Sequence, residues 1–386
     1  MFSPRTKELE VSGIRRMFEA APPGSINLGL GEPDFSPPEC VQEALFDAVR
    51  RGYNKYGPSA GLPALRDAIA ERYRRRLSET GRDHVLVTEG GTEALAVAAL
   101  ALYEPGDEVL VPDPGFVLYS PHARMAGAIP VPFPLDERRD FQPDLEALAD
   151  RLTPRTRAIV VNSPSNPTGA VYSQRVVDGI VDLAREHDLT IISDEVYDEI
   201  LYTGRPHQSF WGRYEKVVLV NSFSKIFALT GWRLGYLLSS PAVVQLANKI
   251  HYHLVACPAT PVQMAALAGL SQARSAVDQM AREFRARRDL FLRGLQKVPG
   301  LRCALPQGAF YAFPRVDWGL SATEAAQALL KAGVITTPGD SFGALGECHL
   351  RLSFATSREN LRRGLEIIGA FAEDLRPSPA AAVARH

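Results

Sequence analysis

The sequence has little cysteine and no apolar segment long enough to cross a membrane. Its four cysteines, in a chain of 386 residues, include no Cys-x-x-Cys pair, which favours a reducing compartment over a disulfide framework. Cys348 and His349 alone cannot provide the roughly four ligands of a zinc site, so we expect no metal. The first residues lack the apolar core of a signal peptide, and no apolar run approaches the roughly 20 residues of a membrane span. We therefore expect a cytoplasmic protein without a membrane segment.

An excess of charge of one sign is also missing. The 43 Lys and Arg side chains nearly balance the 44 Asp and Glu side chains, and the formal net charge is −1. Without a strong net field, binding to nucleic acid or to an anionic membrane is not favoured, and a small-molecule substrate is the better expectation. The densest basic run, Arg72–Arg76, lies in a helical pattern, and we interpret it as a solvated helix face.

Short β-branched segments alternate with longer helical patterns along most of the chain, and no internal repeat is present. This alternation predicts an α/β fold with a mostly parallel central sheet sandwiched by helices. The expected strands span residues 84–88, 108–112, 129–133, 158–162, 190–193 and 216–221. The clearest expected helices span residues 92–103, 173–187 and 241–249.

The pattern changes at a charged amphipathic helix expected from about Ser271 to Lys297, after which the elements become shorter and mixed. We therefore predict a large domain over residues 35–275 and a smaller α+β domain formed by residues 13–34 and 276–373. The tail, residues 374–386, offers little to pack and is expected to be disordered.

Polar residues follow several of the expected strands, and ligands of open parallel sheets collect outside the carboxyl ends of the strands. Gly91 and Thr92 begin a helix after the first strand, where free N–H groups and the helix dipole can bind a phosphate. A glycine turn at such a place is more often only a turn. Asn166, after the strand at 158–162, can present an amide to a ligand. This turn could equally serve only to connect two elements of the fold.

Two ionisable residues at strand ends are harder to explain as packing. Asp194 ends an apolar strand, with Tyr197 three residues later, and a buried carboxylate is costly without a cation, which could be a structural Arg or Lys. Lys225 follows another strand in a largely apolar stretch. Desolvation lowers the pKa of such an amine towards the range in which it is a nucleophile. Arg233 and the nearby Ser222 hydroxyl would suit an anion.

Together these groups match the requirements of pyridoxal 5'-phosphate, which carries a phosphate, a ring nitrogen, a phenolic oxygen and an aldehyde. Asp194 would bind the protonated ring nitrogen, and Lys225 would hold the aldehyde as a Schiff base. Tyr197 and Asn166 would hydrogen-bond the ring oxygen, and Phe116 would stack on the ring. The phosphate end would be bound by Gly91, Thr92, Ser222, Ser224 and Arg233.

Three motifs, at residues 162–169, 193–197 and 222–236, resemble those of the class I/II aminotransferases, a family of fold type I pyridoxal-phosphate enzymes. The resemblance extends from about Gly13 to Ala372. It implies that the amino group of an L-amino acid passes to a 2-oxo acid, most often 2-oxoglutarate, by a ping-pong mechanism through Lys225. Asp194 and Tyr197 would share the catalytic work.

The same resemblance implies substrate contacts and a partner. Arg351 would bind the substrate α-carboxylate bidentately, and Gly31 and Asn166 would approach the substrate. Tyr56 matches a tyrosine that reaches the phosphate of the neighbouring subunit, which implies a homodimer with shared active sites. Phe116 stands where relatives often have Tyr or Trp. The roles of His251 and His253 stay open, with packing favoured.

Other functions are compatible with part of this pattern. A C–S lyase or a cyclopropane-forming synthase would use the same core residues. A ligand-sensing domain of a transcriptional regulator is disfavoured, because the fold begins by about Gly13. A Rossmann dehydrogenase is disfavoured because Gly29-Leu-Gly31 lacks the third glycine of its motif. The donor is left open among aspartate, aromatic amino acids, alanine and branched-chain amino acids, of which we favour aspartate or an aromatic.

Overall fold

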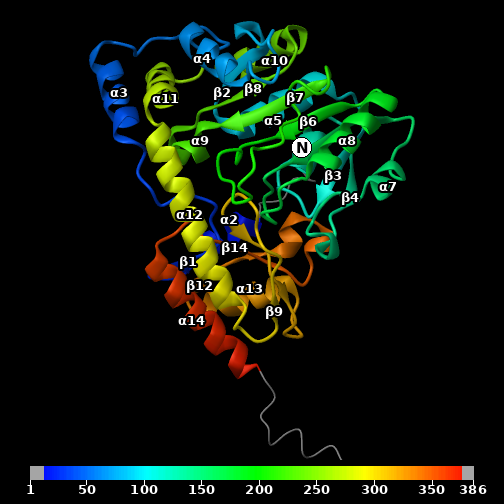
Figure 1. Cartoon of the computed structure of the whole chain (residues 1–386), viewed down its shortest axis with the longest axis vertical. Coiled ribbons are helices and arrows are strands. Elements are labelled where there is room, and N and C mark those ends of the chain that lie inside the picture. Colours follow the sequence, from blue (N-terminus) through cyan, green and yellow to red (C-terminus); the bar gives the residue numbers. More distant parts are fainter. Residues whose placement is uncertain (1–12, 376–386) are drawn as a thin grey trace, which may run out of the picture.

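A seven-stranded sheet forms the centre of the larger part of the computed structural model, which describes residues 13–375 (Figure 1). Its strand order is β2-β8-β7-β6-β5-β3-β4, and only β8 runs against its neighbours. The strands are β2 (Val85–Thr88), β3 (Glu108–Asp113), β4 (Ile129–Pro134), β5 (Thr156–Asn162), β6 (Thr190–Asp194), β7 (Val217–Ser222) and β8 (Gly235–Leu238). The prediction of a mostly parallel sheet is confirmed.

Both faces of this sheet are apolar and both are covered by helices. Successive side chains of a strand point to opposite faces, so Val217 and Leu219 of β7 pack in one core cluster and Val218 and Val220 in another. The first face is covered by α4 (Pro63–Tyr73), α8 (Gln174–Glu186) and α11 (Thr260–Gln272). The second is covered by α5 (Gly90–Leu102), α6 (Tyr119–Met125) and α10 (Pro241–Val255).

Local sequence explains individual elements of this layer. In α8, Val176, Val177, Ile180 and Val181 recur at helical spacing and are buried against the sheet, and each contributes about 1.5–3 kcal/mol. The Ser173 hydroxyl accepts a hydrogen bond from Val176 N (3.3 Å) and caps the helix. β4 carries three prolines and lies at the edge of the sheet, where their missing N–H groups cost no ladder bond.

The smaller part of the molecule is built from short strands and three longer helices. Its helices are α12 (Arg274–Leu295), α13 (Ala322–Lys331) and α14 (Arg358–Asp374), together with the short α2 (Gly13–Glu19) near the start of the chain. Its strands are β1 (Ile26–Asn27), β9 (Leu301–Arg302), β10 (Tyr311–Ala312), β11 (Arg315–Val316), β12 (Val334–Ile335), β13 (Thr337–Pro338) and β14 (Leu350–Ser353).

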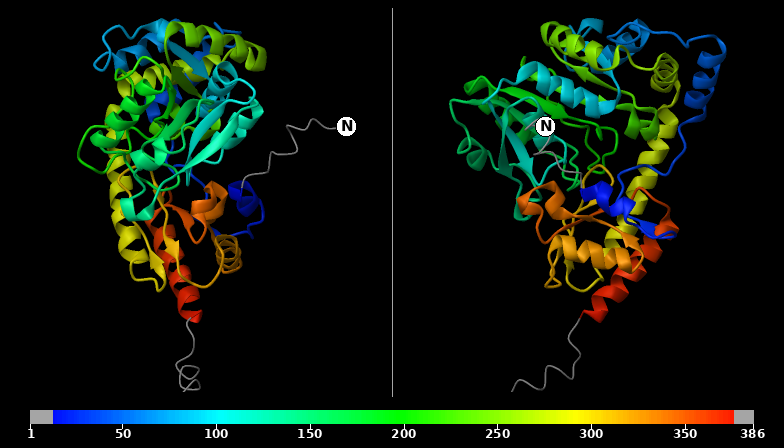
Figure 2. Two further views of the ribbon diagram at one scale, coloured as in Figure 1. Left: turned by 90° about the vertical axis from the view of Figure 1, so that its right-hand side faces the viewer. Right: turned by 180° about the vertical axis from the view of Figure 1, so that it is seen from behind.

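The two parts share α12, which runs from one to the other in all views (Figures 1 and 2). A separate core cluster in the smaller part joins Ile26 and Leu28 with Phe284, Val334 and Leu350. The cluster also includes Tyr197, Ile200 and Tyr202 of the larger part, and the division of the chain at residues 34/35 and 275/276 stays a prediction. Most of the tail that we expect to be disordered, residues 376–386, lies outside the described residues, whereas Asp374 ends α14.

Several sequence expectations need correction. The strand β8 is not among the expected strands, because its four residues directly follow the Lys225 motif and begin with glycine. The helix expected from about Ser271 divides at Ala273, between α11 and α12. Arg72 does not lie on a solvated face: its guanidinium contacts Asp198 (2.6 Å) and Glu199 (2.9 Å) and is largely buried. α4 also ends at Tyr73, so residues 74–76 follow the helix.

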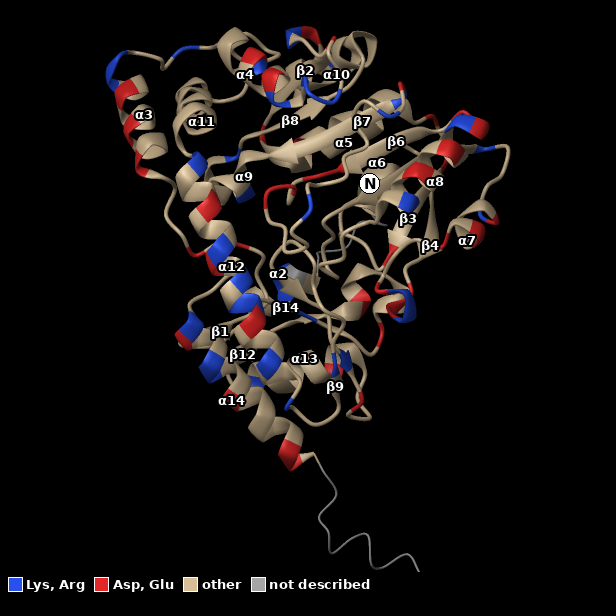
Figure 3. Ribbon diagram, viewed as in Figure 1, with Lys and Arg blue, Asp and Glu red and all other residues tan. Residues whose placement is uncertain are grey.

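The remaining helices of the larger part are α3 (Glu39–Arg50), which packs on α11, and the short α7 (Leu145–Ala149) and α9 (Phe223–Ile226). Arg residues are interspersed with Asp and Glu along α12, so this helix carries both signs of charge (Figure 3). Among the described residues, no helix is long and apolar enough to span a membrane.

Candidate active site

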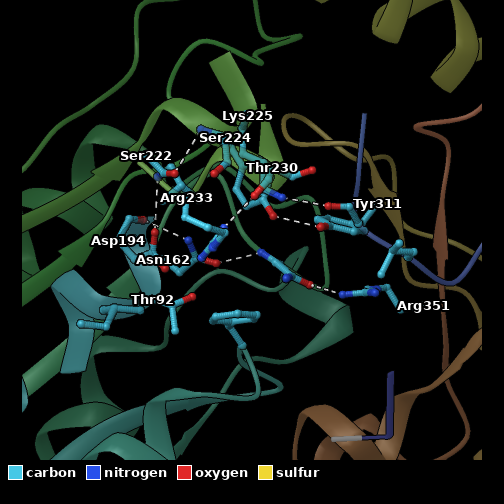
Figure 4. A pocket seen from close by; sticks show the side chains of 18 residues that line it. Thr92, Asn162, Asp194, Ser222, Ser224, Lys225, Thr230, Arg233, Tyr311 and Arg351 are labelled. Atoms are coloured by element: carbon cyan, nitrogen blue, oxygen red, sulfur yellow. Dashed lines mark hydrogen bonds between the residues drawn. The ribbon is translucent and has the colours of Figure 1, made fainter. Parts of the chain in front are cut away.

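A cavity of about 230 Å³ opens at the carboxyl ends of the parallel strands. Asp194 and Lys225 of the larger part lie on one side of it, and Tyr311 and Arg351 of the smaller part on the other (Figure 4). Every site residue proposed from the sequence lines it except Tyr56. The predicted residues that it brings together are Gly31, Gly91, Thr92, Phe116, Asn166, Asp194, Tyr197, Ser222, Ser224, Lys225, Arg233 and Arg351.

Lys225 is placed by the short helix α9, which begins directly after β7. The Ser222 hydroxyl accepts a hydrogen bond from Ser224 N (3.1 Å), which caps the turn and directs the Lys225 side chain into the cavity. Its Nζ donates to the Gly31 carbonyl (2.8 Å). Burial lowers the pKa of the amine to about 8, so a neutral, nucleophilic form is accessible near neutral pH.

Asp194 lies at the end of β6 and is buried. Its Oδ2 accepts a hydrogen bond from the Tyr119 hydroxyl (2.8 Å), and its Oδ1 accepts one from Val196 N (3.3 Å). Burial raises the pKa of the carboxyl to about 6, although both hydrogen bonds favour the ionised form. No Lys or Arg of the described residues forms an ion pair with it, so the structural cation considered for Asp194 is not found there.

Tyr119 was missed by the sequence reasoning. It begins α6, three residues after Phe116, and the two rings meet edge to face with centroids 5.6 Å apart. Tyr119 and Asp194 are 75 residues apart in sequence. Tyr119 lies on α6 after β3, and Asp194 ends β6, so their contact depends on the order of the strands in the sheet. The only local signal is that a tyrosine begins the helix three residues after Phe116, the residue expected to stack.

A chain of amides connects Asp194 to the far side of the cavity. Asn162 donates to the Asp194 carbonyl (2.9 Å) and accepts from Asn166 N (2.8 Å). The Asn166 side-chain oxygen accepts a hydrogen bond from Arg351 Nη1 (3.0 Å). These contacts fix Asn166 between Asp194 and Arg351.

Arg351 is almost completely buried on β14. Its guanidinium lies over the rings of Tyr311 (4.6 Å) and Phe342 (4.9 Å), and Nη2 also donates to the Gly29 carbonyl. Its Nε has no hydrogen-bond partner among the described residues. A buried guanidinium with an unused donor is suited to a carboxylate ligand.

Tyr197 and Tyr311 form a hydroxyl pair at this wall, with 2.9 Å between their oxygens. Burial raises the pKa of both phenols, so both stay protonated near neutral pH. Tyr311 was not proposed as a site residue from the sequence. It also explains Gly31, since a Cβ at that position would lie 1.9 Å from the Tyr311 hydroxyl.

The start of α5 forms the polar end of the cavity. Gly90 has a positive φ of 79°, and a Cβ there would lie 2.7 Å from Arg233 Nη2. Gly91 and Thr92, in the first turn of the helix, line the cavity together with Ser222 and Arg233. Free N–H groups, a helix dipole and a guanidinium make this end suitable for a phosphate.

Two groups singled out from the sequence lie elsewhere. Tyr56 is 91% exposed and does not line the cavity of its own chain. His253 is exposed on α10, whereas His251 is buried and its Nδ1 lies 2.8 Å from Glu93 Oε1. Neither histidine lines the cavity.

The fold and this cavity place the protein among the α/β enzymes. The chain belongs to the aminotransferase class I and II family, whose sequence pattern matches residues 23–368. Its resemblance to this family, carried by three motifs, is thereby confirmed. The protein is an aminotransferase.

Individual relatives agree with this assignment. Over 375 residues, 94% of this chain and 96% of the relative, it is 38% identical to aromatic-amino-acid aminotransferase 2 of Thermococcus litoralis. It is 43% identical over 349 residues to the aspartate/prephenate aminotransferase of Thermus thermophilus, covering 88% of this chain and 89% of the relative. These names describe amino-group transfer and do not favour a lyase or a synthase.

The fold agrees as well. The structure of Thermus thermophilus aspartate aminotransferase with maleate superposes with a TM-score of 0.91 at 37% identity, and the match covers 96% of this chain and 99% of that one. The aromatic aminotransferase of Pyrococcus horikoshii gives a TM-score of 0.88 at 37% identity, with 94% and 99% covered.

Proposed function

We propose that this aminotransferase holds pyridoxal 5'-phosphate in the cavity through a covalent bond to Lys225. The observation that carries the proposal is the pairing, in one cavity, of a buried amine with a buried carboxylate that has no cation of its own. A protonated pyridine nitrogen would supply the cation that Asp194 lacks. The resemblance to the family, whose members use this cofactor, points the same way.

The polar groups of the cavity fit the rest of the cofactor. The start of α5 at Gly91 and Thr92, together with Ser222, Ser224 and Arg233, would hold the phosphate. Phe116 would cover the ring. Tyr197 and Asn166 would reach the ring oxygen. Both line the cavity and contact residues of the smaller part, Tyr197 with Tyr311 and Asn166 with Arg351.

When bound, pyridoxal phosphate supplies an electrophilic carbon for the substrate amine and a ring that accepts the electron pair of the substrate α-carbon. Asp194 would hold the ring nitrogen with its negative charge, and the hydrogen bond from Tyr119 favours the ionised form of that carboxylate. The Lys225 amine, once released, takes the proton from the substrate α-carbon as a general base. In the reverse half-reaction the same amine returns a proton to the α-carbon.

Arg351 would fix the substrate by its α-carboxylate, with Asn166 and the Gly31 backbone alongside. In the described part of the chain, the cations that line the cavity are Lys225, Arg233 and Arg351, and each already has a role. The apolar and aromatic part of the lining is formed by Leu30, Leu95, Phe116, Val196 and Tyr311. A distal carboxylate would find no further cation there, so we favour an aromatic amino acid over aspartate as the donor.

We further propose a homodimer in which Tyr56 completes the partner's site. The exposed apolar side chains Tyr252, Leu254 and Val255 lie at the end of α10. Shortly after them, Thr260 bonds the carbonyl of Lys55, next to Tyr56. These exposed apolar side chains, and an exposed tyrosine that does not line the cavity of its own chain, support an interface between two copies. The cytoplasmic location stays a proposal as well.

Borohydride reduction of the purified yellow protein tests the attachment. The label should be recovered on the peptide that contains Lys225 and should be absent from the Lys225→Ala variant. Recovery on another lysine, such as Lys249, would contradict the assignment.

A donor screen tests the reaction. We expect phenylalanine and tyrosine to exceed aspartate in kcat/KM when about twenty amino acids are supplied with 2-oxoglutarate, oxaloacetate or pyruvate. Several acceptors are needed, because 2-oxoglutarate and oxaloacetate carry a second carboxylate, which would also lack a cation in the cavity, whereas pyruvate does not. Aspartate as the best donor would overturn the donor assignment, and steady release of pyruvate and ammonia without an acceptor would indicate a lyase.

A further inference from the structure

His251 is a buried histidine outside the cavity that contacts the helix at its polar end. It lies on α10, which packs against α5, and it has no exposed surface. Its Nδ1 is 2.8 Å from Glu93 Oε1. Because a carboxylate only accepts hydrogen bonds, Nδ1 carries the proton and donates it.

Glu93 is bound at both of its oxygens. It lies in the first turn of α5, and its Oε2 accepts a hydrogen bond from Glu89 N (2.5 Å). The Glu89 carboxylate in turn accepts from Ala259 N (3.3 Å). The Glu93 carboxylate is therefore folded back against the residue that precedes the helix and held there by His251.

Glu89, whose N–H is bound by Glu93, directly precedes the first residue of α5. Glu89 is followed by Gly90, whose left-handed conformation brings its Cα against Arg233, and then by the N–H groups of Gly91 and Thr92. The positive end of a helix attracts any nearby anion. A carboxylate in the first turn is thus a competitor for a phosphate bound at the same N–H groups, unless another contact holds it away.

We propose that His251 is a positioning residue for the cofactor phosphate. It binds Glu93 so that this carboxylate stays on the far side of the first turn and leaves the N–H groups of Gly91 and Thr92 free. The proposal rests on the proposed function, in which the phosphate of pyridoxal phosphate binds at this helix start.

The effect should be specific to the phosphate, and this separates it from general packing. Cofactor-free wild-type protein and variants are titrated with pyridoxal phosphate and with pyridoxal, which lacks the phosphate, and Kd is measured by absorbance. His251→Leu removes the donor and should weaken pyridoxal phosphate about tenfold, the size of one hydrogen bond to a charged group, while pyridoxal changes less than about twofold.

Matched variants sharpen the comparison. His251→Asn places an amide nitrogen near the position of Nδ1 and should keep most of the affinity, whereas His251→Gln places it near Nε2 and should behave like the Leu variant. His253→Leu, on the exposed side of the same helix, is the control and should bind both ligands as the wild type does. In the double variant His251→Leu/Glu93→Gln the competing charge is gone, so the phosphate-specific loss should shrink.

The outcomes separate the two proposals. Equal losses for pyridoxal phosphate and pyridoxal, or no loss in either the Leu or the Gln variant, would overturn the role of His251 while leaving the cofactor proposal intact. If the Leu variant does not fold, as judged by circular dichroism, the Asn and Gln pair gives the same comparison. A wild-type protein that binds neither ligand would overturn the proposed function, and the role of His251 with it.

Discussion

The burial of the Lys225 amine should destabilise the cofactor-free protein below about pH 8. Its pKa falls from 10.5 to about 8, so between these values the unfolded chain binds a proton that the folded chain does not, and stability rises with pH. The difference corresponds to about 3 kcal/mol. Lys225→Met should therefore increase the free energy of unfolding by up to about 3 kcal/mol at pH 7, with a gain that fades towards pH 10.5.

Urea unfolding of the two cofactor-free proteins at a series of pH values measures this gain. Other groups that titrate in alkaline solution are common to both proteins and cancel in the difference. A gain that does not depend on pH would mean that the amine is solvated in the folded protein.

The hydroxyl of Tyr119 should set the lower pH limit of cofactor binding through Asp194. Its hydrogen bond favours the carboxylate, so Tyr119→Phe should raise the Asp194 pKa further above about 6. Binding of pyridoxal phosphate needs the ionised form of Asp194, so the affinity should then be lost at a higher pH than in the wild type. A hydrogen bond to a charged group is worth about 1.5–3 kcal/mol, which corresponds to a shift of about 1–2 pH units.

The measurement is the Kd of pyridoxal phosphate from about pH 5 to pH 9. Tyr172→Phe is the control, because the buried Tyr172 hydroxyl has no hydrogen-bond partner among the described residues. An unchanged acidic limb in the Tyr119 variant would exclude Asp194 as the group that titrates there.

At the level of elements, the site depends on how closely α5 approaches β8. Gly235 begins β8, and a Cβ there would lie 2.6 Å from both Gly90 C and Gly91 N. These are backbone atoms that cannot rotate away. Gly235→Ala should therefore displace the first turn of α5, destabilise the protein by about 1–3 kcal/mol and weaken pyridoxal phosphate binding.

Gly231→Ala is the matched control for this substitution. It lies four residues earlier in the same segment, and a Cβ there meets no atom within 4 Å. Thermal unfolding and cofactor titration of both variants provide the comparison. Equal behaviour of the two would mean that α5 moves without cost and that the close approach to β8 does not support the site.

At the scale of the whole molecule, a shared site predicts complementation between two defective subunits. Tyr56→Phe and Lys225→Ala each damage every site of their own homodimer. In a heterodimer, the site with Lys225 from the Tyr56→Phe chain receives an intact Tyr56 from the other chain. Activity should recover in that one site to roughly half of a wild-type dimer, as two-fold symmetry requires.

Refolding the two variants together, with heterodimers verified by mass, tests this expectation. The Tyr56→Phe homodimer must first show a clear defect. A mixture no more active than the sum of its parents would then mean that Tyr56 serves its own chain or only packs.

The sequence by itself determined six of the seven strands of the sheet and most of the residues that gather at its edge. Alternating apolar strands predict a mostly parallel sheet, and in such a sheet the residues that follow each strand must meet at one edge. The pattern of strands is therefore enough to place Asp194 and Lys225 in one site. Arg351 came only from the resemblance to the family, since nothing local links the strand that carries it to that edge.

Only the tertiary structure decided the contacts that tune these groups. Tyr119 lies 75 residues from Asp194, His251 lies 158 residues from Glu93, and Arg72 lies 126 residues from Asp198. Periodicity and strand ends are local properties of a chain, and they carry no information on which distant polar side chains will meet. Such pairs form only after helices pack on a sheet, because burial then makes an unpaired polar group costly.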